Sequence, residues 1–239
     1  MNTRGHCYPK HIILQAVYFK LRFTLSYRDV EEIMKIRGVL VDHATIQRWV
    51  YKFTPLLESA MKKRKGRVGG SWRLDETYIK VNGIWCYLYR AVDKLGNTVD
   101  FLLTRKRQRI SAQSFLIKAM SNNCRPRVIN IDKSGSNTAA IKVYNKRSFS
   151  KIKIRQCKYL NNIVEQDHRF IKWRIQNALG FKSFESAKRT LSGIEVVHML
   201  RKNHMLRKNH MLRKNHMLRK NQMVRPAISM FKSFCKLAG

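Results

Sequence analysis

Acidic side chains are scarce in this chain of 239 residues. It contains 14 Asp and Glu against 50 Lys and Arg, a formal net charge of +36. The usual partner of so basic a surface is a polyanion, nucleic acid first and an anionic membrane second. Because 44% of the residues are hydrophobic, the chain can bury a core, so the charge belongs to a folded protein and not to a disordered tail.

Cysteines are few and long apolar runs are missing. The five cysteines are scattered and never form a CxxC pair, which argues against a disulfide framework and the common structural zinc site. No apolar run reaches the roughly 18 residues of a membrane span. The N-terminus also lacks the pattern of a secretory signal. We therefore expect a cytoplasmic protein with no membrane partner.

Residues 1–66 predict helices joined by short turns. Ser26 and Asp29 resemble a capping box, and Asp42 can cap the next helix. The polar face of that helix carries the candidates for DNA contact, His43, Thr45, Gln47, Arg48 and Lys52. A short turn between two helices, the second polar and basic, is typical of a helix-turn-helix. The alternative is a small helical bundle with solvated lysines; the net charge favours DNA binding.

A basic stretch with two glycines, residues 62–70, predicts a linker that is either a solvated hinge or a phosphate contact. Beyond this linker the apolar residues recur at every second position, as in a β-strand. Strands are predicted at 72–81, 84–92, 98–103, 127–131 and 152–156, and helices at 112–120, 137–145 and from 161 or 162 to 176. The second strand is apolar on both faces, so we expect it to be buried on both. This element order is that of an α/β, ribonuclease H-like domain.

Three carboxylates lie where this fold would gather them. Asp75 is in the first strand, Asp132 directly follows the fourth, and Glu165 is in the first turns of the last helix. The first and fourth strands are neighbours in the predicted sheet, so their carboxylates can converge with the helix over them. Phosphodiester transfer uses two Mg²⁺ ions about 3.5–4 Å apart, and Mg²⁺ prefers carboxylate oxygens. Asp75, Asp132 and Glu165 are therefore the predicted catalytic and metal-binding residues.

Neighbouring polar residues test this assignment. Glu76 should point to the opposite face of the strand from Asp75, and Asp167 should point away from Glu165; salt bridges or surface positions are their ordinary roles. Lys172, seven residues after Glu165, lies on the same helix face and can reach the DNA backbone. His168 could touch the site, although a surface or satisfied histidine is the simpler interpretation.

Several stretches together resemble bacterial DDE transposases of the insertion-sequence-six family. Residues 72–80, 129–133 and 158–168 are similar to its three catalytic blocks. Residues 25–30 and 41–50 resemble its helix-turn-helix, and 180–184 its post-catalytic block. The 32 residues between Asp132 and Glu165 are slightly fewer than is usual for the family, so this loop is shortened.

The resemblance implies a retroviral-integrase-like fold and dependence on Mg²⁺, with Mn²⁺ as a possible substitute. It also implies cutting and joining at terminal inverted repeats, usually with replicative cointegrate formation. The implied partners are double-stranded DNA, both element ends and target, and further copies of the chain in a dimeric or larger synaptic complex. The implied location is the bacterial nucleoid.

The hexapeptide His-Met-Leu-Arg-Lys-Asn at 198–203 recurs without change three more times, to residue 221. Six residues turn a helix by a net angle of about 240°, so the Met-Leu pair forms no continuous apolar stripe. We expect a protruding basic helix produced by duplication; the same rotation disfavours a histidine metal site.

The expected domains are 1–66, helix-turn-helix with basic linker; 67–196, ribonuclease H-like catalytic domain; and 197–239, basic helical tail.

The hypotheses for function belong to different classes. The first is a transposase, and the alternative is a catalytically inactive remnant that binds DNA only through its helix-turn-helix. The complete set of Asp75, Asp132 and Glu165 favours the first. An RNA-cleaving nuclease of the same fold is disfavoured, because a helix-turn-helix reads the major groove of B-form DNA. Membrane binding is weakest, because the basic residues form no single amphipathic face.

Overall fold

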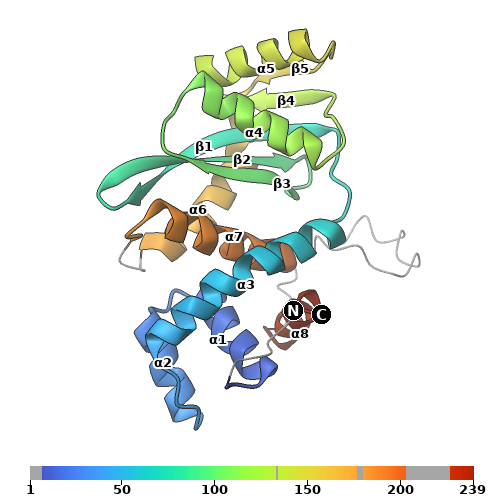
Figure 1. The fold of residues 1–239 in the computed structure, drawn as a ribbon. Helices are drawn as coiled ribbons and strands as arrows, with labels where there is room; N and C mark the ends of the chain where they lie inside the picture. The colour runs from blue at the N-terminus through green and yellow to red at the C-terminus, as the bar shows by residue number, and fades with distance from the viewer. Residues whose placement is uncertain (1–6, 133, 177–179, 203–226) are drawn as a thin grey trace, which may run out of the picture. The chain divides into compact units, whose positions relative to one another are not determined.

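The computed structural model describes residues 7–132, 134–176, 180–202 and 227–239 (Figure 1). They form two compact units. One unit comprises Met1–Gly66 together with Arg189–Gly239, and the other comprises Arg67–Lys188. The domain boundaries expected from the sequence, after residues 66 and 196, stay predictions. None of the described helices is long and apolar enough to cross a bilayer.

The first unit is helical. It contains α1 (Lys10–Arg22), α2 (Tyr27–Ile36), α3 (His43–Arg64), α8 (Ala227–Leu237) and most of α7 (Phe184–Arg201). The capping box that starts α2 is confirmed: Asp29 N donates to Ser26 Oγ at 3.0 Å, and Ser26 N donates to Asp29 Oδ2 at 2.7 Å. Asp42 caps α3 by accepting from Thr45 N at 2.9 Å. Both helix starts therefore follow from local side-chain chemistry.

The core of this unit packs α3, α7 and α8 against α1. Trp49 and Phe53 of α3 are buried, and the rings of Tyr18 and Phe234 lie 5.2 Å apart. Helix α7 approaches α1 closely at Gly193, where an added Cβ would lie 2.5 Å from a methyl carbon of Leu21. A larger residue at position 193 would force the two helices apart.

The C-terminal segment differs in part from the expected basic tail. Met230, Phe234 and Leu237 are buried, so α8 belongs to the core of its unit. Their spacing of four and three residues forms the apolar stripe that the hexapeptides lack. The start of the first hexapeptide is buried at the end of α7. The remaining copies, with the predicted protruding helix, lie outside the described residues.

The second unit contains a five-stranded sheet in the order β3-β2-β1-β4-β5. Its strands are β1 (Ser71–Val81), β2 (Ile84–Asp93), β3 (Thr98–Thr104), β4 (Val128–Ile131) and β5 (Lys153–Gln156). The first three form an antiparallel meander, and β4 and β5 run parallel to β1. Asn82 and Gly83, both with positive φ, make the predicted hairpin turn. The mixed α/β fold and its element order are those predicted.

Alternation along the strands assigns the helices to the two faces of the sheet (Figure 1). Tyr89 of β2 stacks on Phe115 of α4 (Arg109–Ser121), and α5 (Gly135–Arg147) covers the same face. The short helix η1 (Lys158–Asn161) and α6 (Asn162–Gln176) lie on the other face, because Asp167 of α6 pairs with Arg90 of β2. Adjacent side chains of β2 thus contact helices on opposite faces of the sheet.

The expected burial of β2 on both faces is confirmed for residues 88–93 and wrong at the hairpin tip. There Ile84 and Trp85 are 66% and 56% exposed. Here β4 pairs only with 71–73 of β1, and β3 pairs with β2 only from Tyr87 onward. The tip of the β1–β2 hairpin therefore extends beyond its neighbouring strands and exposes its side chains.

Candidate active site

The register of two parallel strands places Asp75 and Asp132 together. Arg73 of β1 is aligned with Asn130 of β4. Continued for two residues, this register sets Asp132 beside Asp75, and neighbouring strands are about 4.8 Å apart. Asp75 is 19% exposed, and Asp132 is exposed where β4 ends. Asp132 Oδ1 accepts a hydrogen bond from Ser134 N at 3.1 Å, which orients the carboxylate at the strand end.

Helix α6 faces Asp75. The Nε2 atom of His168 lies 3.4 Å from Asp75 Oδ2, and His168 is only 4% exposed, so a surface position for this histidine is wrong. Burial lowers the pKa of His168 below its ordinary value, although the interaction with Asp75 opposes the shift. The imidazole is therefore neutral at neutral pH and can donate one N–H to the carboxylate.

Glu165 and Lys172 lie on α6 on either side of His168 along the helix. Half-buried Glu165 is in the first turn, three residues before His168, and exposed Lys172 follows it by four residues. Residues three and four apart share a helix face, so all three side chains face the same side as Asp75. The roles of Glu165 in metal binding and of Lys172 in DNA binding stay predictions.

Two buried polar contacts that sequence reasoning missed fix α6 in this place. Asn130 Nδ2 of β4 donates to Asn161 Oδ1 at 2.7 Å, directly before α6 begins. Arg90 Nη1 donates to Asp167 Oδ2 at 3.0 Å, and the guanidinium side chain is fully buried. Asp167 thus points away from the carboxylates and forms a salt bridge, one of its two predicted roles.

Glu76 lies on the other face of β1, as the strand period predicted. Its carboxylate accepts from Asn137 Nδ2 of α5 at 2.8 Å and from Arg107 Nε at 2.7 Å. The side chain is 3% exposed, so Glu76 is a structural acid within the α4–α5 layer. Adjacent acids in the sequence therefore have separate environments.

The three predicted site carboxylates offer the oxygen ligands that a hard divalent cation prefers. Asp75, Asp132 and Glu165 are oxygen donors of the kind that Mg²⁺ prefers, and each is at least partly exposed. In the part of the chain that the structure describes, no three His, Cys, Asp or Glu side chains already lie close enough together to hold a metal ion. Completing the set requires Asp132 and Glu165 to approach Asp75 across the strand end.

The predicted DNA-contacting residues of α3 have varied surroundings. His43 Nδ1 lies 2.8 Å from Glu31 Oε2 of α2, and Thr45 Oγ1 donates to Asp42 Oδ2 at 2.6 Å. Gln47 Nε2 donates to the hydroxyl of Tyr51 at 3.1 Å. His43 and Thr45 thus help to join α2 and cap α3.

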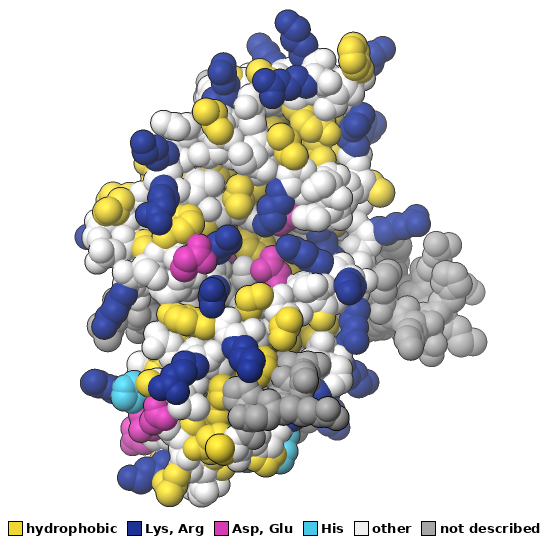
Figure 2. Space-filling view, in the orientation of Figure 1, with side chains coloured by type: hydrophobic (Ala, Val, Ile, Leu, Met, Phe, Trp, Pro, Cys, Tyr) yellow, Lys and Arg dark blue, Asp and Glu magenta, His cyan; other side chains and the backbone are white. Residues whose placement is uncertain are grey.

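Arg48 and Lys52 are exposed on the same helix. They are the members of the predicted set best placed to meet a ligand from solvent. In the view of Figure 2, Lys and Arg side chains are spread widely among a few acidic ones. The surface charge is thus distributed over many elements and not confined to α3.

The chain is similar to a family of known proteins and to individual members of known function. Residues 69–204 match the sequence profile of a family described as a DDE domain. The chain is 41% identical over 197 residues to the transposase for insertion sequence-like element IS431mec of Staphylococcus aureus strain Mu50, covering 82% of this chain and 86% of the relative. It is equally similar to the transposase for insertion sequence element IS257 in transposon Tn4003 of S. aureus. The HTLV-2 integrase catalytic core in complex with magnesium, in its trimeric form, superposes with a TM-score of 0.44 at 16% identity, covering 56% of this chain and 88% of that one.

Proposed function

Because the chain belongs to the DDE transposases of the insertion-sequence-six family, we propose that it nicks the ends of its own insertion sequence and joins them to target DNA. The observation that carries this proposal is the alignment of Asp75 with Asp132 opposite the helix of Glu165. A family member that had lost its chemistry would not need to keep these three carboxylates on one face of the sheet.

The proposed roles follow from the positions of the side chains. Asp75, Asp132 and Glu165 would hold Mg²⁺, with Mn²⁺ as a substitute, and the metal would supply charge stabilisation at the attacking and leaving oxygens. His168, whose Nε2 lies 3.4 Å from Asp75 Oδ2, is proposed to keep this carboxylate directed toward α6. Lys172, exposed on the same helix face, pairs with a phosphate of the bound strand. In nicking, water attacks the phosphorus, so that the phosphate stays on the 5′ end of the flanking strand and the 3′-hydroxyl of the element end leaves. In strand transfer that hydroxyl attacks a target phosphodiester and displaces a 3′-hydroxyl of the target strand.

The helical unit is proposed to recognise the element ends as a helix-turn-helix. Helix α3 is the proposed recognition helix, with exposed Arg48 directed to a guanine edge and Gln47 to adenine. Joining two ends to one target needs at least two catalytic units, so we expect a dimer or larger assembly on DNA. The proposed DNA partners of this assembly are the double-stranded element ends and the target DNA.

The test uses purified protein, Mg²⁺ and a labelled duplex that carries an element end. Wild-type protein should nick the 3′ side of the end and transfer the strand to a plasmid. Asp75→Asn, Asp132→Asn and Glu165→Gln should each abolish both products while duplex binding persists. Glu185→Gln is the matched control, because Glu185 is likewise an acid in the first turn of a helix but is exposed on α7. Full activity of Glu165→Gln would overturn the assignment; a wild-type protein that only binds DNA would support the inactive-remnant alternative.

A further inference from the structure

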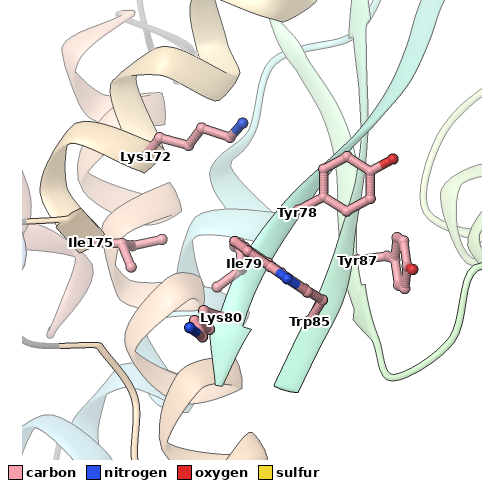
Figure 3. Close-up of a pocket in the computed structure, with 7 residues that line it drawn as sticks. All are labelled: Tyr78, Ile79, Lys80, Trp85, Tyr87, Lys172 and Ile175. Atoms are coloured by element: carbon pink, nitrogen blue, oxygen red, sulfur yellow. The ribbon is translucent and has the colours of Figure 1, made fainter. Parts of the chain in front are cut away.

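A pocket at the hairpin tip is not explained by the roles proposed so far. It has a volume of about 580 Å³ and lies between the β1–β2 hairpin and α6 (Figure 3). Its lining includes Tyr78, Lys80, Trp85 and Tyr87 from the hairpin and Lys172 and Ile175 from the helix. We call it the aromatic pocket.

The aromatic rings of this pocket are exposed and pack against one another. Tyr78 is 45% and Trp85 56% exposed. The ring of Tyr78 lies edge-on to both Trp85, at 6.3 Å between centroids, and Tyr87, at 5.3 Å. Clustered aromatic surface left in water is unfavourable and marks a place where a ligand binds.

The charges around the rings indicate what that ligand is. Lys80 Nζ lies 5.8 Å from the centre of the Trp85 ring. Figure 3 shows Lys172 extending from α6 toward the hairpin, and none of the described residues that line the pocket is acidic. Aromatic faces combined with lysines are the features that bind unpaired nucleotides, through base stacking and phosphate contacts. A second copy of this chain would instead bring further positive charge to the lysines.

The position of the pocket relates it to the candidate active site. Tyr78 follows Asp75 by three residues on β1, so its side chain lies on the opposite face of the strand, that of Glu76. Lys172, in contrast, follows Glu165 by seven on α6, the helix that faces Asp75. The pocket is therefore reached from the carboxylates round the edge of β1, which pairs with β4 only at 71–73. The separations of three residues on β1 and seven on α6 are each about 10 Å along the element. At a rise of about 3.4 Å per nucleotide in stacked DNA, the pocket is within a few nucleotides of the carboxylates.

We propose that the aromatic pocket binds an unpaired nucleotide of the DNA strand next to the reacting phosphodiester. Its base stacks on Trp85 and Tyr78, and its phosphate lies between Lys80 and Lys172. The proposal rests on the function proposed above, and it adds that the protein holds the DNA end with at least one base out of the duplex. A duplex with a frayed or single-stranded end is therefore a better ligand than a blunt one.

Binding is measured by fluorescence anisotropy in buffer without divalent metal, so that no chemistry occurs. The probes are a blunt duplex and the same duplex with three unpaired nucleotides on either strand, one of them 2-aminopurine. Wild-type protein should bind one of the extended duplexes more tightly, with quenching of the 2-aminopurine as it stacks. Trp85→Ala should remove that gain, a loss of about 5- to 150-fold, without changing blunt-duplex binding. Ile84→Ala, an exposed neighbour that does not line the pocket, should behave as wild type.

Each other outcome overturns the proposal. Equal affinity for blunt and extended duplexes, or an unchanged preference in Trp85→Ala, excludes a stacking role. If Trp85→Ala instead converts a dimer to a monomer in sedimentation, the pocket is an interface between copies. Failure of the proposed function is seen separately with Mg²⁺, as the absence of nicking by wild-type protein. Because Trp85 is exposed, the alanine variant should keep the wild-type circular dichroism and melting temperature.

Discussion

Removing the carboxylate of Asp167 should destabilise the catalytic unit by about 3–5 kcal/mol. The guanidinium of Arg90 is fully buried, and its Nη1 donates to Asp167 Oδ2 at 3.0 Å. Burial lowers the pKa of Arg90, and Asp167 opposes that shift. In Asp167→Ala the positive charge stays buried without this carboxylate, which is the costly case for an ion pair taken out of water.

Two further variants separate the buried pair from general effects of charge. Glu58→Ala breaks the ion pair between Glu58 and Lys62 on α3, whose Lys62 side chain is 39% exposed. An exposed pair of this kind contributes about 0–1 kcal/mol. The double variant Arg90→Met/Asp167→Leu replaces the buried ions by apolar groups of similar size and should recover most of the lost stability.

The assay is urea unfolding followed by hydrogen exchange and mass spectrometry of peptides from β2 and α6. Peptides from α3 are followed in the same way for Glu58→Ala, so that each variant is measured in its own unit, and urea leaves the ion pairs unscreened. Asp167→Ala should shift the protection of both elements to lower urea, and the double variant should restore it. The reasoning is refuted if Asp167→Ala costs no more than Glu58→Ala, or if the double variant is as unstable as the single one.

Further predictions concern the helical unit and the hexapeptides. Burial lowers the pKa of Lys20 to about 8, below the 10.5 of an ordinary lysine, so between these two pH values the unfolded chain binds more protons than the folded one. The free energy of unfolding, measured by urea titration at each pH, should therefore rise by at most about 2 kcal/mol from pH 8 to pH 10 relative to Lys20→Met. A difference between the two proteins that does not change with pH would contradict the shift. Arg48→Ala should weaken binding of the element end by about 1–3 kcal/mol relative to an unrelated duplex in competition assays, whereas equal loss on both duplexes would indicate a phosphate contact only. Deleting 204–221, which joins Asn203 to Gln222 and removes six positive charges, should leave nicking at saturating protein unchanged and make the salt dependence of DNA binding shallower; unfolding would show that the copies belong to the core.

Local chemistry made much of the fold predictable. The capping residues Ser26, Asp29 and Asp42 start their helices by bonds to amides three residues away, so the sequence alone identifies them. The period of two along β1 likewise separated Asp75 from Glu76 and placed each on its own face of the sheet. Such features depend on neighbours in the chain.

The features that were missed depend on residues far apart in sequence. Arg90 and Asp167 are 77 residues apart, and Asn130 and Asn161 are 31 apart, so no local pattern reveals either pair. The exposure of Trp85 was missed for a related reason. An apolar strand predicts burial only if its neighbours extend equally far, and the short β4 does not.

The central claim is that Asp75, Asp132 and Glu165 together form one divalent-cation site, and metal-directed cleavage of the protein tests it most directly. Fe²⁺ is bound in place of Mg²⁺ in the presence of an element-end duplex, and ascorbate with peroxide then generates radicals that cut the backbone beside the metal. The account predicts cuts near all three residues, suppressed by excess Mg²⁺ and lost together in Asp75→Asn but not in Glu185→Gln. Cuts confined to other segments, or unchanged in Asp75→Asn, would contradict it.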